Sequence, residues 1–136
     1  MIKKLLLSLF VVFLVLGCSP KVPQQEVKEK ANIEEKGYYL ISFGRSKVEV
    51  PKSAKIILVN GEYAGFSGCN SMRGKYDIDG NKVKFYIAVS TRKTCPDIDL
   101  ENVFKKLLLK VDNYEVDGKN MILKSENQEV LNFKER

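Results

Sequence analysis

The sequence of 136 residues contains no histidine and no tryptophan, and it has only three cysteines. Without histidine, the commonest general base and the commonest metal ligand are missing, and so are the Ser-His and Cys-His pairs that activate nucleophiles. No two cysteines form a Cys-x-x-Cys motif, a frequent spacing in zinc and thiol redox sites. These absences argue against an enzyme and against a bound metal, so we expect neither.

Long apolar runs are also scarce, and the one that exists lies near the start of the sequence. Two lysines precede an almost unbroken apolar stretch over residues 5–16, and a Gly-Cys pair follows it. Twelve helical residues reach about 18 Å, well short of the ~30 Å hydrocarbon core of a bilayer. Basic residues before a short apolar stretch are typical of an export signal. Residues 1–17 are therefore predicted to be a signal peptide.

The motif Val15-Leu16-Gly17-Cys18 resembles the lipobox of bacterial lipoproteins. The resemblance implies cleavage before Cys18 and a covalent lipid, diacylglycerol with palmitate, on that cysteine; no other cofactor is expected. An ordinary signal peptide with a cysteine near its cleavage site is the alternative. Ser19 is not the Asp associated with inner-membrane retention. We therefore expect the outer membrane, facing the periplasm, in a two-membrane bacterium, and otherwise the outer face of the plasma membrane.

Charge of one sign is only mildly in excess, because 21 basic and 17 acidic residues remain after residue 17. The lysines are scattered among acids and no nucleic-acid motif is visible, so a nucleic-acid partner is not expected. The residual positive charge is compatible with a weak attraction to anionic lipid headgroups.

Residues 18–36 contain no aromatic residue and are dominated by Lys, Glu, Gln and Pro. A segment of this composition buries little apolar surface, so we expect a lipidated N-terminus that continues as a flexible tether. Aromatic and β-branched runs begin after Gly37, which predicts one folded domain over residues 37–136.

Within residues 37–136, short runs of β-branched and aromatic residues alternate with turns that contain glycine. Asp79-Gly80 and Asp117-Gly118 are typical hairpin turns. The expected strands cover residues 38–43, 55–59, 62–67, 74–78, 82–87, 114–116, 121–123 and 130–133.

One segment has the periodicity of a helix, and its apolar stripe comprises Leu100, Val103, Phe104, Leu107, Leu108 and Val111. Asp97, Asp99 and Glu101 lie near its start, where acids complement the helix dipole. We therefore expect the α+β class: a mostly antiparallel, strongly curled sheet with one amphipathic helix packed on it.

The sequence contains an ordered set of blocks: residues 65–76 with their Gly-Cys-Asn motif, Gly80, Phe85, residues 88–96 with Cys-Pro, Glu101, Phe104, Leu107 and Tyr114. These blocks occur in the order found in the META domain, the family that includes the heat-inducible HslJ proteins of bacterial envelopes. The chain therefore resembles this family over residues 37–136. The resemblance implies a small β-rich roll or barrel with a helix and a link to stress resistance and envelope integrity, but no known reaction. The family often has Trp in its first strand, and here Tyr39 stands in its place.

Cys69 and Cys95 remain once Cys18 is assigned to lipid, and in an oxidising compartment an even pair favours a disulfide. Two buried free thiols, or a redox or metal site, are the alternatives. Near them lies a candidate binding or structural loop that comprises Gly68, Asn70, Arg73, Ser90 and Thr91. Backbone amides between the glycines are able to meet a ligand, but turn geometry and loop hydrogen bonds are the favoured roles.

The aromatic residues Tyr38, Tyr39, Tyr63, Tyr76 and Tyr86 are expected mainly in the core or in cross-strand pairs. Taken together, the sequence predicts a monomeric, non-catalytic envelope lipoprotein. It would be held on a membrane by its lipid and act in stress resistance or envelope maintenance by binding an unidentified envelope protein or small ligand. A peptidase inhibitor that presents a rigid loop, and a thiol oxidoreductase that uses Cys69 or Cys95, are the alternatives.

Overall fold

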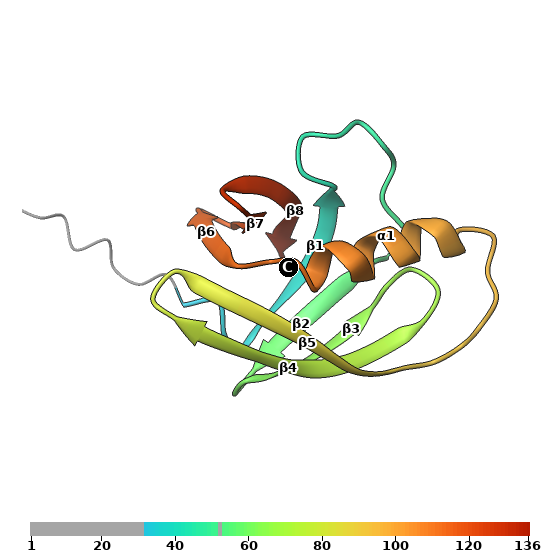
Figure 1. Ribbon diagram of the computed structural model, residues 1–136, viewed down its shortest axis with the longest axis horizontal. Helices are drawn as coiled ribbons and strands as arrows, with labels where there is room; N and C mark the ends of the chain where they lie inside the picture. Colours follow the sequence, from blue (N-terminus) through green and yellow to red (C-terminus); the bar gives the residue numbers. More distant parts are fainter. Residues whose placement is uncertain (1–31, 52) are drawn as a thin grey trace, which may run out of the picture.

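The computed structural model describes residues 32–51 and 53–136 (Figure 1). The predicted signal peptide, the predicted lipid site at Cys18 and most of the predicted tether lie outside the described residues. Within the described ranges, no helix has both the length and the apolar character that crossing a bilayer requires.

The described residues form eight strands and one helix. In chain order these are β1 Lys36–Ser42, β2 Lys55–Val59, β3 Glu62–Phe66, β4 Ser71–Asp79, β5 Lys82–Ser90, α1 Ile98–Leu108, β6 Asn113–Asp117, β7 Asn120–Ser125 and β8 Gln128–Glu135. Every strand pairs antiparallel with its sequence neighbour, and β8 returns to pair with β1, so the sheet closes into a ring. The predicted α+β class, with a mostly antiparallel sheet and one helix, is confirmed.

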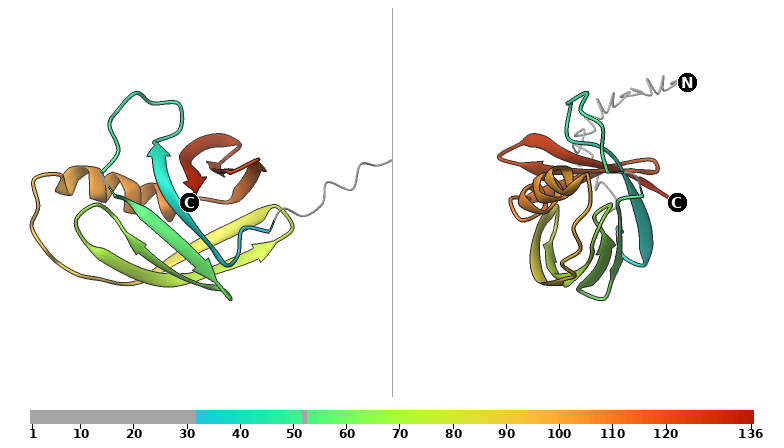
Figure 2. Two further views of the ribbon diagram at one scale, coloured as in Figure 1. Left: turned by 180° about the vertical axis from the view of Figure 1, so that it is seen from behind. Right: turned by 90° about the vertical axis from the view of Figure 1, so that its right-hand side faces the viewer.

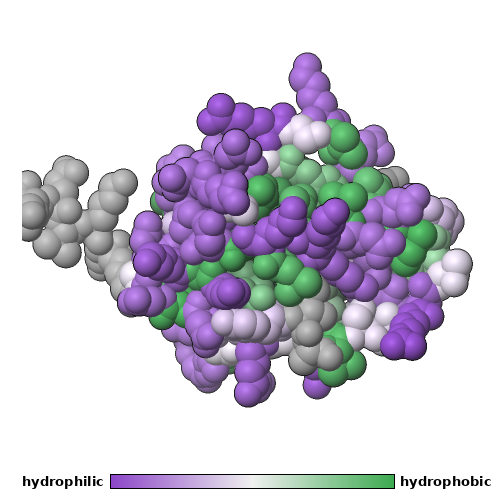
Figure 3. Space-filling model, in the orientation of Figure 1, coloured by the Kyte–Doolittle hydropathy of each residue, from purple (hydrophilic) through white to green (hydrophobic). Residues whose placement is uncertain are grey.

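The alternation of side chains along each strand explains why the ring has an apolar interior. In β4, Met72, Gly74 and Tyr76 are buried, whereas Arg73 and Lys75 between them are exposed. Such a period of two residues puts one face of a strand in the core and the other in water. Hydrophilic side chains accordingly cover much of the face drawn in Figure 3, with apolar ones between them. The hairpins that join β4 to β5 and β6 to β7 turn at Gly80 and Gly118, whose φ angles are +64° and +57°.

Helix α1 lies beside the weakest seam of the ring. Within the described residues, the register of β5 and β6 joins them at one position, Lys82 with Asn113. The helix lies between β5 and the part of the ring formed by β6–β8 (Figures 1 and 2). Phe104 of α1 packs against Phe133 of β8, with ring centroids 6.1 Å apart. Side chains of α1 therefore cover the part of the seam where β5 and β6 are not paired.

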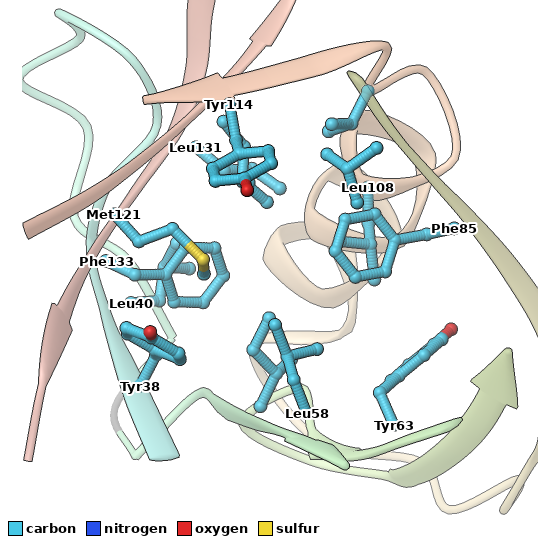
Figure 4. Packing of buried hydrophobic residues seen from close by; sticks show 14 of the residues in the cluster. Tyr38, Leu40, Leu58, Tyr63, Phe85, Leu108, Tyr114, Met121, Leu131 and Phe133 are labelled. Atoms are coloured by element: carbon cyan, nitrogen blue, oxygen red, sulfur yellow. The ribbon is translucent and has the colours of Figure 1, made fainter. Parts of the chain in front are cut away.

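Side chains from all around the ring meet in a single core (Figure 4). Its largest fully buried members include Phe85, Phe104 and Phe133, each at most 1% exposed. Of the five tyrosines singled out from the sequence, three are in this core, namely Tyr38, Tyr63 and Tyr76, whereas Tyr39 and Tyr86 are exposed. Burial raises the pKa of Tyr63 to about 12, because its phenolate would lose hydration inside the ring.

The folded domain begins earlier than the sequence pattern indicates. Ile33, which the sequence analysis placed in the tether, is 1% exposed and belongs to the core. Next to it, Glu34 accepts a hydrogen bond of 2.8 Å from Tyr76 Oη, and the Glu35 N–H donates to Leu58 O at 2.7 Å. A lone isoleucine among charged residues gives no periodic signal, although its burial fixes where the chain joins the ring.

Gly74 is required by close packing. A Cβ at this position would lie 1.8 Å from Tyr86 O and 2.6 Å from Tyr63 Cε1. Tyr63 is its cross-strand neighbour in β3, and the register of β4 with β5 shifts between Arg73 and Gly74. The missing side chain of Gly74 thus leaves room for the ring of Tyr63 on one side and for the backbone of β5 at Tyr86 on the other.

We therefore predict that Gly74→Ala lowers the free energy of unfolding by about 3 kcal/mol, because a backbone oxygen cannot yield as a flexible side chain does. Gly37→Ala is the matched control, since its Cβ would meet only Ile57 Cγ1 at 3.6 Å. This control should stay within about 0.5 kcal/mol of the parent. Urea unfolding of both variants checks the prediction, and equal midpoints would contradict it.

Candidate functional site

The motif residues meet at one end of the ring, and the chain enters at the other. The turn over residues 67–70 joins β3 to β4, and residues 91–97 lead from β5 into α1. These two segments lie at the end of the ring where α1 begins (Figure 1). Asn32 instead lines a pocket with Asp77 and Ile78, next to the hairpin between β4 and β5 at the opposite end. A surface built from the motif segments therefore points away from the first residues that the structure describes.

A disulfide between Cys69 and Cys95 ties the two segments together, with their Cα atoms 6.0 Å apart. This is the pairing that the sequence analysis favoured. Cys69 is 6% exposed, whereas Cys95 is half-buried. It closes the loop that contains β4 and β5, and it holds the segment after β5 against the turn before β4.

Asn70 connects the same two segments through its side-chain amide. Its Oδ1 accepts hydrogen bonds from Thr91 Oγ1 at 2.8 Å and from the Lys93 N–H at 2.7 Å. Its Nδ2 donates to Glu101 Oε1 at 2.9 Å and to Lys93 O at 3.2 Å. The side chain is 2% exposed and uses both its donor and its acceptor atoms. Asn70 thus acts as a structural bridge.

Glu101 is a buried carboxylate on α1, only 1% exposed. It accepts a hydrogen bond of 2.6 Å from Ser67 Oγ and one of 2.9 Å from the Asn70 N–H, and it forms an ion pair with Lys105. Burial by itself raises the pKa of this carboxyl, but the hydrogen bonds from Lys105, Ser67 and Asn70 outweigh burial. The pKa therefore lies below the ordinary value of 4.5, and Glu101 is ionised at neutral pH.

A serine and a lysine come together beside this carboxylate. Lys105 Nζ donates a hydrogen bond of 2.9 Å to Ser90 Oγ while it also donates to Glu101. In a Ser-Lys nucleophile pair the lysine has to accept the serine proton. Here the lysine is the donor to both partners, and Ser90 Oγ in turn donates to Thr91 O at 3.1 Å. The pair joins α1 to the end of β5 and has no free base.

The structure brings together most of the candidate loop residues predicted from the sequence. Asn70, Ser90 and Thr91 share one hydrogen-bonded network with the disulfide. Gly68 has a φ of +103°, and a Cβ there would lie 2.3 Å from Pro51 Cβ, so its role is to pack. Arg73 is exposed on the outer side of β4 and takes no part in the network.

Sequence reasoning missed three members of the network, namely Ser67, Glu101 and Lys105. Glu101 was assigned to the helix dipole together with Asp97 and Asp99, which are indeed exposed. A signal existed, because Glu101 lies three residues before Phe104 and seven before Leu108, on the buried stripe of the helix. An acid on an apolar stripe needs partners, and the Ser67–Asn70 turn supplies them.

The network fixes backbone and leaves other side chains free to make contacts. Its polar atoms are bonded mainly to one another, whereas Arg92, Lys93 and Thr94 beside it are exposed. Across the described ranges, no three His, Cys, Asp or Glu residues are grouped so as to hold a metal ion. The arrangement is that of a clamped, solvent-facing loop.

A closed antiparallel ring of strands with one helix over its seam places the chain in a class of small β-rich domains. Solved structures of other proteins have a similar fold. An NMR structure of a protein from Burkholderia xenovorans has a TM-score of 0.65 and 22% identity, covering 76% of this chain and 83% of that one. A crystal structure of a DUF4847 family protein from Bacteroides vulgatus has a TM-score of 0.61 and 14% identity, covering 75% and 93%. At these identities the likeness shows the fold alone.

The family model of the META domain matches residues 31–136, so the chain belongs to the META domain family. The match begins two residues before Ile33, where the packed domain starts. No curated protein matches the chain.

Glu101→Gln tests the network. We predict a loss of about 3 kcal/mol in the free energy of unfolding at pH 7, because Lys105 loses its buried counter-charge. Since the folded pKa lies below 4.5, the carboxylate stabilises the fold above that value, and its contribution is lost as pH falls below it. The gap between parent and variant should therefore shrink on acidification, as measured by urea unfolding across pH. The exposed Asp99→Asn is the control, and a pH-independent gap would contradict the account.

The disulfide gives a separate prediction. The loop it closes has a sequence separation of 26 residues, and in the chain-entropy model this corresponds to about 3.5 kcal/mol of stabilisation. Cys69→Ser with Cys95→Ser should lower the free energy of unfolding by about that amount. In the denatured, unreduced parent, a maleimide probe should find neither thiol, as read by mass spectrometry of peptides; labelling at both positions would refute the bond.

Proposed function

We propose that this META domain protein is a non-catalytic lipoprotein of the bacterial cell envelope, anchored through lipid on Cys18. It holds an envelope partner, a protein or a small ligand, and in this way contributes to stress resistance or envelope maintenance. Membership of the META family supports the proposal, as do the export-signal pattern of residues 1–17 and the lipobox-like motif that ends at Cys18.

The observation that carries the binding role is the clamped loop over residues 91–96. Thr91 and Lys93 are bonded to Asn70, and Cys95 is bonded to Cys69, so the loop is tied at three points along its length. Most of its side chains nevertheless face solvent. A loop that is already ordered loses little conformational entropy on binding, which favours affinity.

The chemistry of the loop indicates what kind of partner it suits. Arg92 and Lys93 are adjacent and exposed, and neither forms an ion pair with a carboxylate among the described residues. Two unpaired positive charges at the end of the domain remote from the chain's point of entry favour an acidic surface on the partner, and they accelerate its association. The partner class is therefore an acidic protein surface or an anionic ligand.

The same loop, over residues 91–96, also supports the alternative that the protein is a peptidase inhibitor. A rigid, exposed segment with adjacent arginine and lysine side chains has the features of a substrate-like loop for proteases that cleave after basic residues. Stoichiometric inhibition of such a protease, abolished by Arg92→Ala with Lys93→Ala, would favour this alternative. The thiol oxidoreductase alternative has less support, because Cys69 is 6% exposed and lies inside the network.

Crosslinking in intact cells tests the binding role. Arg92→Glu with Lys93→Glu should reduce the crosslinked adduct about tenfold, equivalent to about 1.4 kcal/mol. Lys119→Glu with Arg136→Glu makes the same change of charge at exposed positions by the start of β1, and should leave the adduct unchanged. There the Arg136 N–H donates to Gly37 O, and the Glu135 N–H donates to Lys119 O. An adduct that falls equally in both pairs would contradict the role of the loop.

The anchor is checked in the same cells. Radiolabelled palmitate should enter the parent and the charge variants but not Cys18→Ala, because the lipid is attached through that thiol. If the parent stays unlabelled and fractionates with soluble proteins, the lipoprotein part of the proposal fails, whatever the crosslinking shows.

A further inference from the structure

The outer side of the first three strands is unusually apolar for a solvent-facing surface. We call it the β1–β3 face. It carries four of the nine large hydrophobic side chains that are exposed in the described residues: Tyr39 at 37%, Ile41 at 49%, Ile57 at 44% and Val59 at 41%. All four come from β1 and β2, which are hydrogen-bonded neighbours. They therefore form one patch.

A shallow groove of about 670 Å³ continues this patch over β3 and β4. Its lining includes Ile57, Val59 and Ala64, with Arg73 and Lys75 at the β4 side. Ala64 pairs with Ile57 on one side and with Arg73 on the other, so a short side chain lies between two long ones. This difference in length produces the hollow.

Positive charge surrounds the apolar patch. Lys55 and Lys134 are the cross-strand neighbours of Tyr39 in β2 and β8, and Arg73 and Lys75 border the groove. None of these four forms an ion pair with a carboxylate of the described part of the chain. Glu62 is the acid in the groove lining. It lies opposite Lys75 in the register of β3 with β4, whereas Lys55, Arg73 and Lys134 have no acid opposite them. The face therefore keeps an excess of positive charge that is complementary to an anionic surface.

Acids elsewhere on β4 do not change this balance. Asp77 and Asp79 lie opposite Lys84 and Lys82 of β5, so each faces a base of its own.

The chain reaches the ring beside this face. The Glu35 N–H is bonded to Leu58 O of β2, so the segment that leads from Cys18 arrives at the edge of the β1–β3 face. Fourteen residue steps separate Cys18 from Asn32, and a chain of that length spans at most about 50 Å. A lipid on Cys18 would therefore keep the face within reach of the bilayer surface.

We propose that the β1–β3 face docks on the surface of a bilayer that contains anionic lipid; this inference rests on the proposed anchor at Cys18. Ile57, Val59 and Tyr39 lie against the headgroup and acyl boundary, where exposed apolar and aromatic side chains gain from leaving water. Lys55, Arg73, Lys75 and Lys134 meet the anionic headgroups. The clamped loop over residues 91–96 then remains accessible to its partner.

The absence of tryptophan from the sequence provides a clean test, because one introduced indole reports only its own position. The full lipidated chain is reconstituted on vesicles of phosphatidylcholine, alone or mixed with phosphatidylglycerol, with or without acyl-chain bromination. Ile57→Trp places the reporter on the β1–β3 face. Val103→Trp, at a position on α1 that is 42% exposed, is the matched control.

The proposal predicts that the indole at position 57 emits at shorter wavelength and is quenched by brominated lipid on anionic vesicles, and that the control is not. High salt, or Arg73→Glu with Lys75→Glu, should bring this quenching down to the control level. Equal quenching at positions 57 and 103, or equal quenching on neutral and anionic vesicles, would overturn the proposal. So would a water-like emission on vesicles that shifts only when an acidic protein is added.

Flotation of every variant with the vesicles reports the anchor separately. A chain that floats while the indole at position 57 remains in water refutes docking but leaves the anchor intact. A chain that does not float in any form refutes the anchor itself.

Discussion

The buried carboxylate of Glu101 and its donors hold the motif-bearing end of the molecule together. A charge at 1% exposure is tolerated only when it is paired and hydrogen-bonded. Its donors come from the turn before β4, through Ser67 and Asn70, and from the next turn of α1, through Lys105. Helix α1 also covers the seam between β5 and β6. Displacing it would therefore separate Glu101 from Ser67 and Asn70 and would at the same time expose the core at this seam. The polar network and the apolar core are therefore coupled through one helix.

This coupling separates the parts of the molecule that are fixed from those that are free to make contacts. At the motif end, the side chains of Ser67, Asn70, Glu101 and Lys105 form hydrogen bonds and an ion pair with one another. These polar groups therefore have a structural role. The exposed side chains of Arg92 and Lys93 in the loop, and of Tyr39, Ile57 and Val59 on the β1–β3 face, have no such commitments among the described residues. Rigid support beneath exposed side chains is the arrangement that the proposed binding role requires.

Much of the fold could be predicted from local sequence pattern, and the reason is physical. Alternation in β4, glycine turns at Gly80 and Gly118, and the apolar stripe of α1 are each short-range signals, and each gave the right element. Closure of the ring could not be read in this way, because β1 pairs with β8 some ninety positions further along the chain. The burial of Ile33 was missed because one isoleucine among charges has no period.

The candidate site was predicted in part for the same reasons. Cys69, Asn70, Ser90 and Thr91 were found because they lie in motif blocks, and the structure unites them. Glu101 was misjudged because acids at helix starts usually complement the dipole, and only its spacing from Phe104 pointed inward. The contact between Ser90 and Lys105 depends on how α1 crosses the seam, which no local pattern encodes.

Amide hydrogen exchange at Asn70 and Lys93 tests the central role of the network most directly. Both N–H groups lie outside the strands, yet the first donates to Glu101 Oε2 at 2.9 Å and the second to Asn70 Oδ1 at 2.7 Å. The account predicts that both exchange as slowly as amides in the core strands and that both become fast in Glu101→Gln. Exchange in the parent as fast as at the exposed Gly80 turn would contradict it.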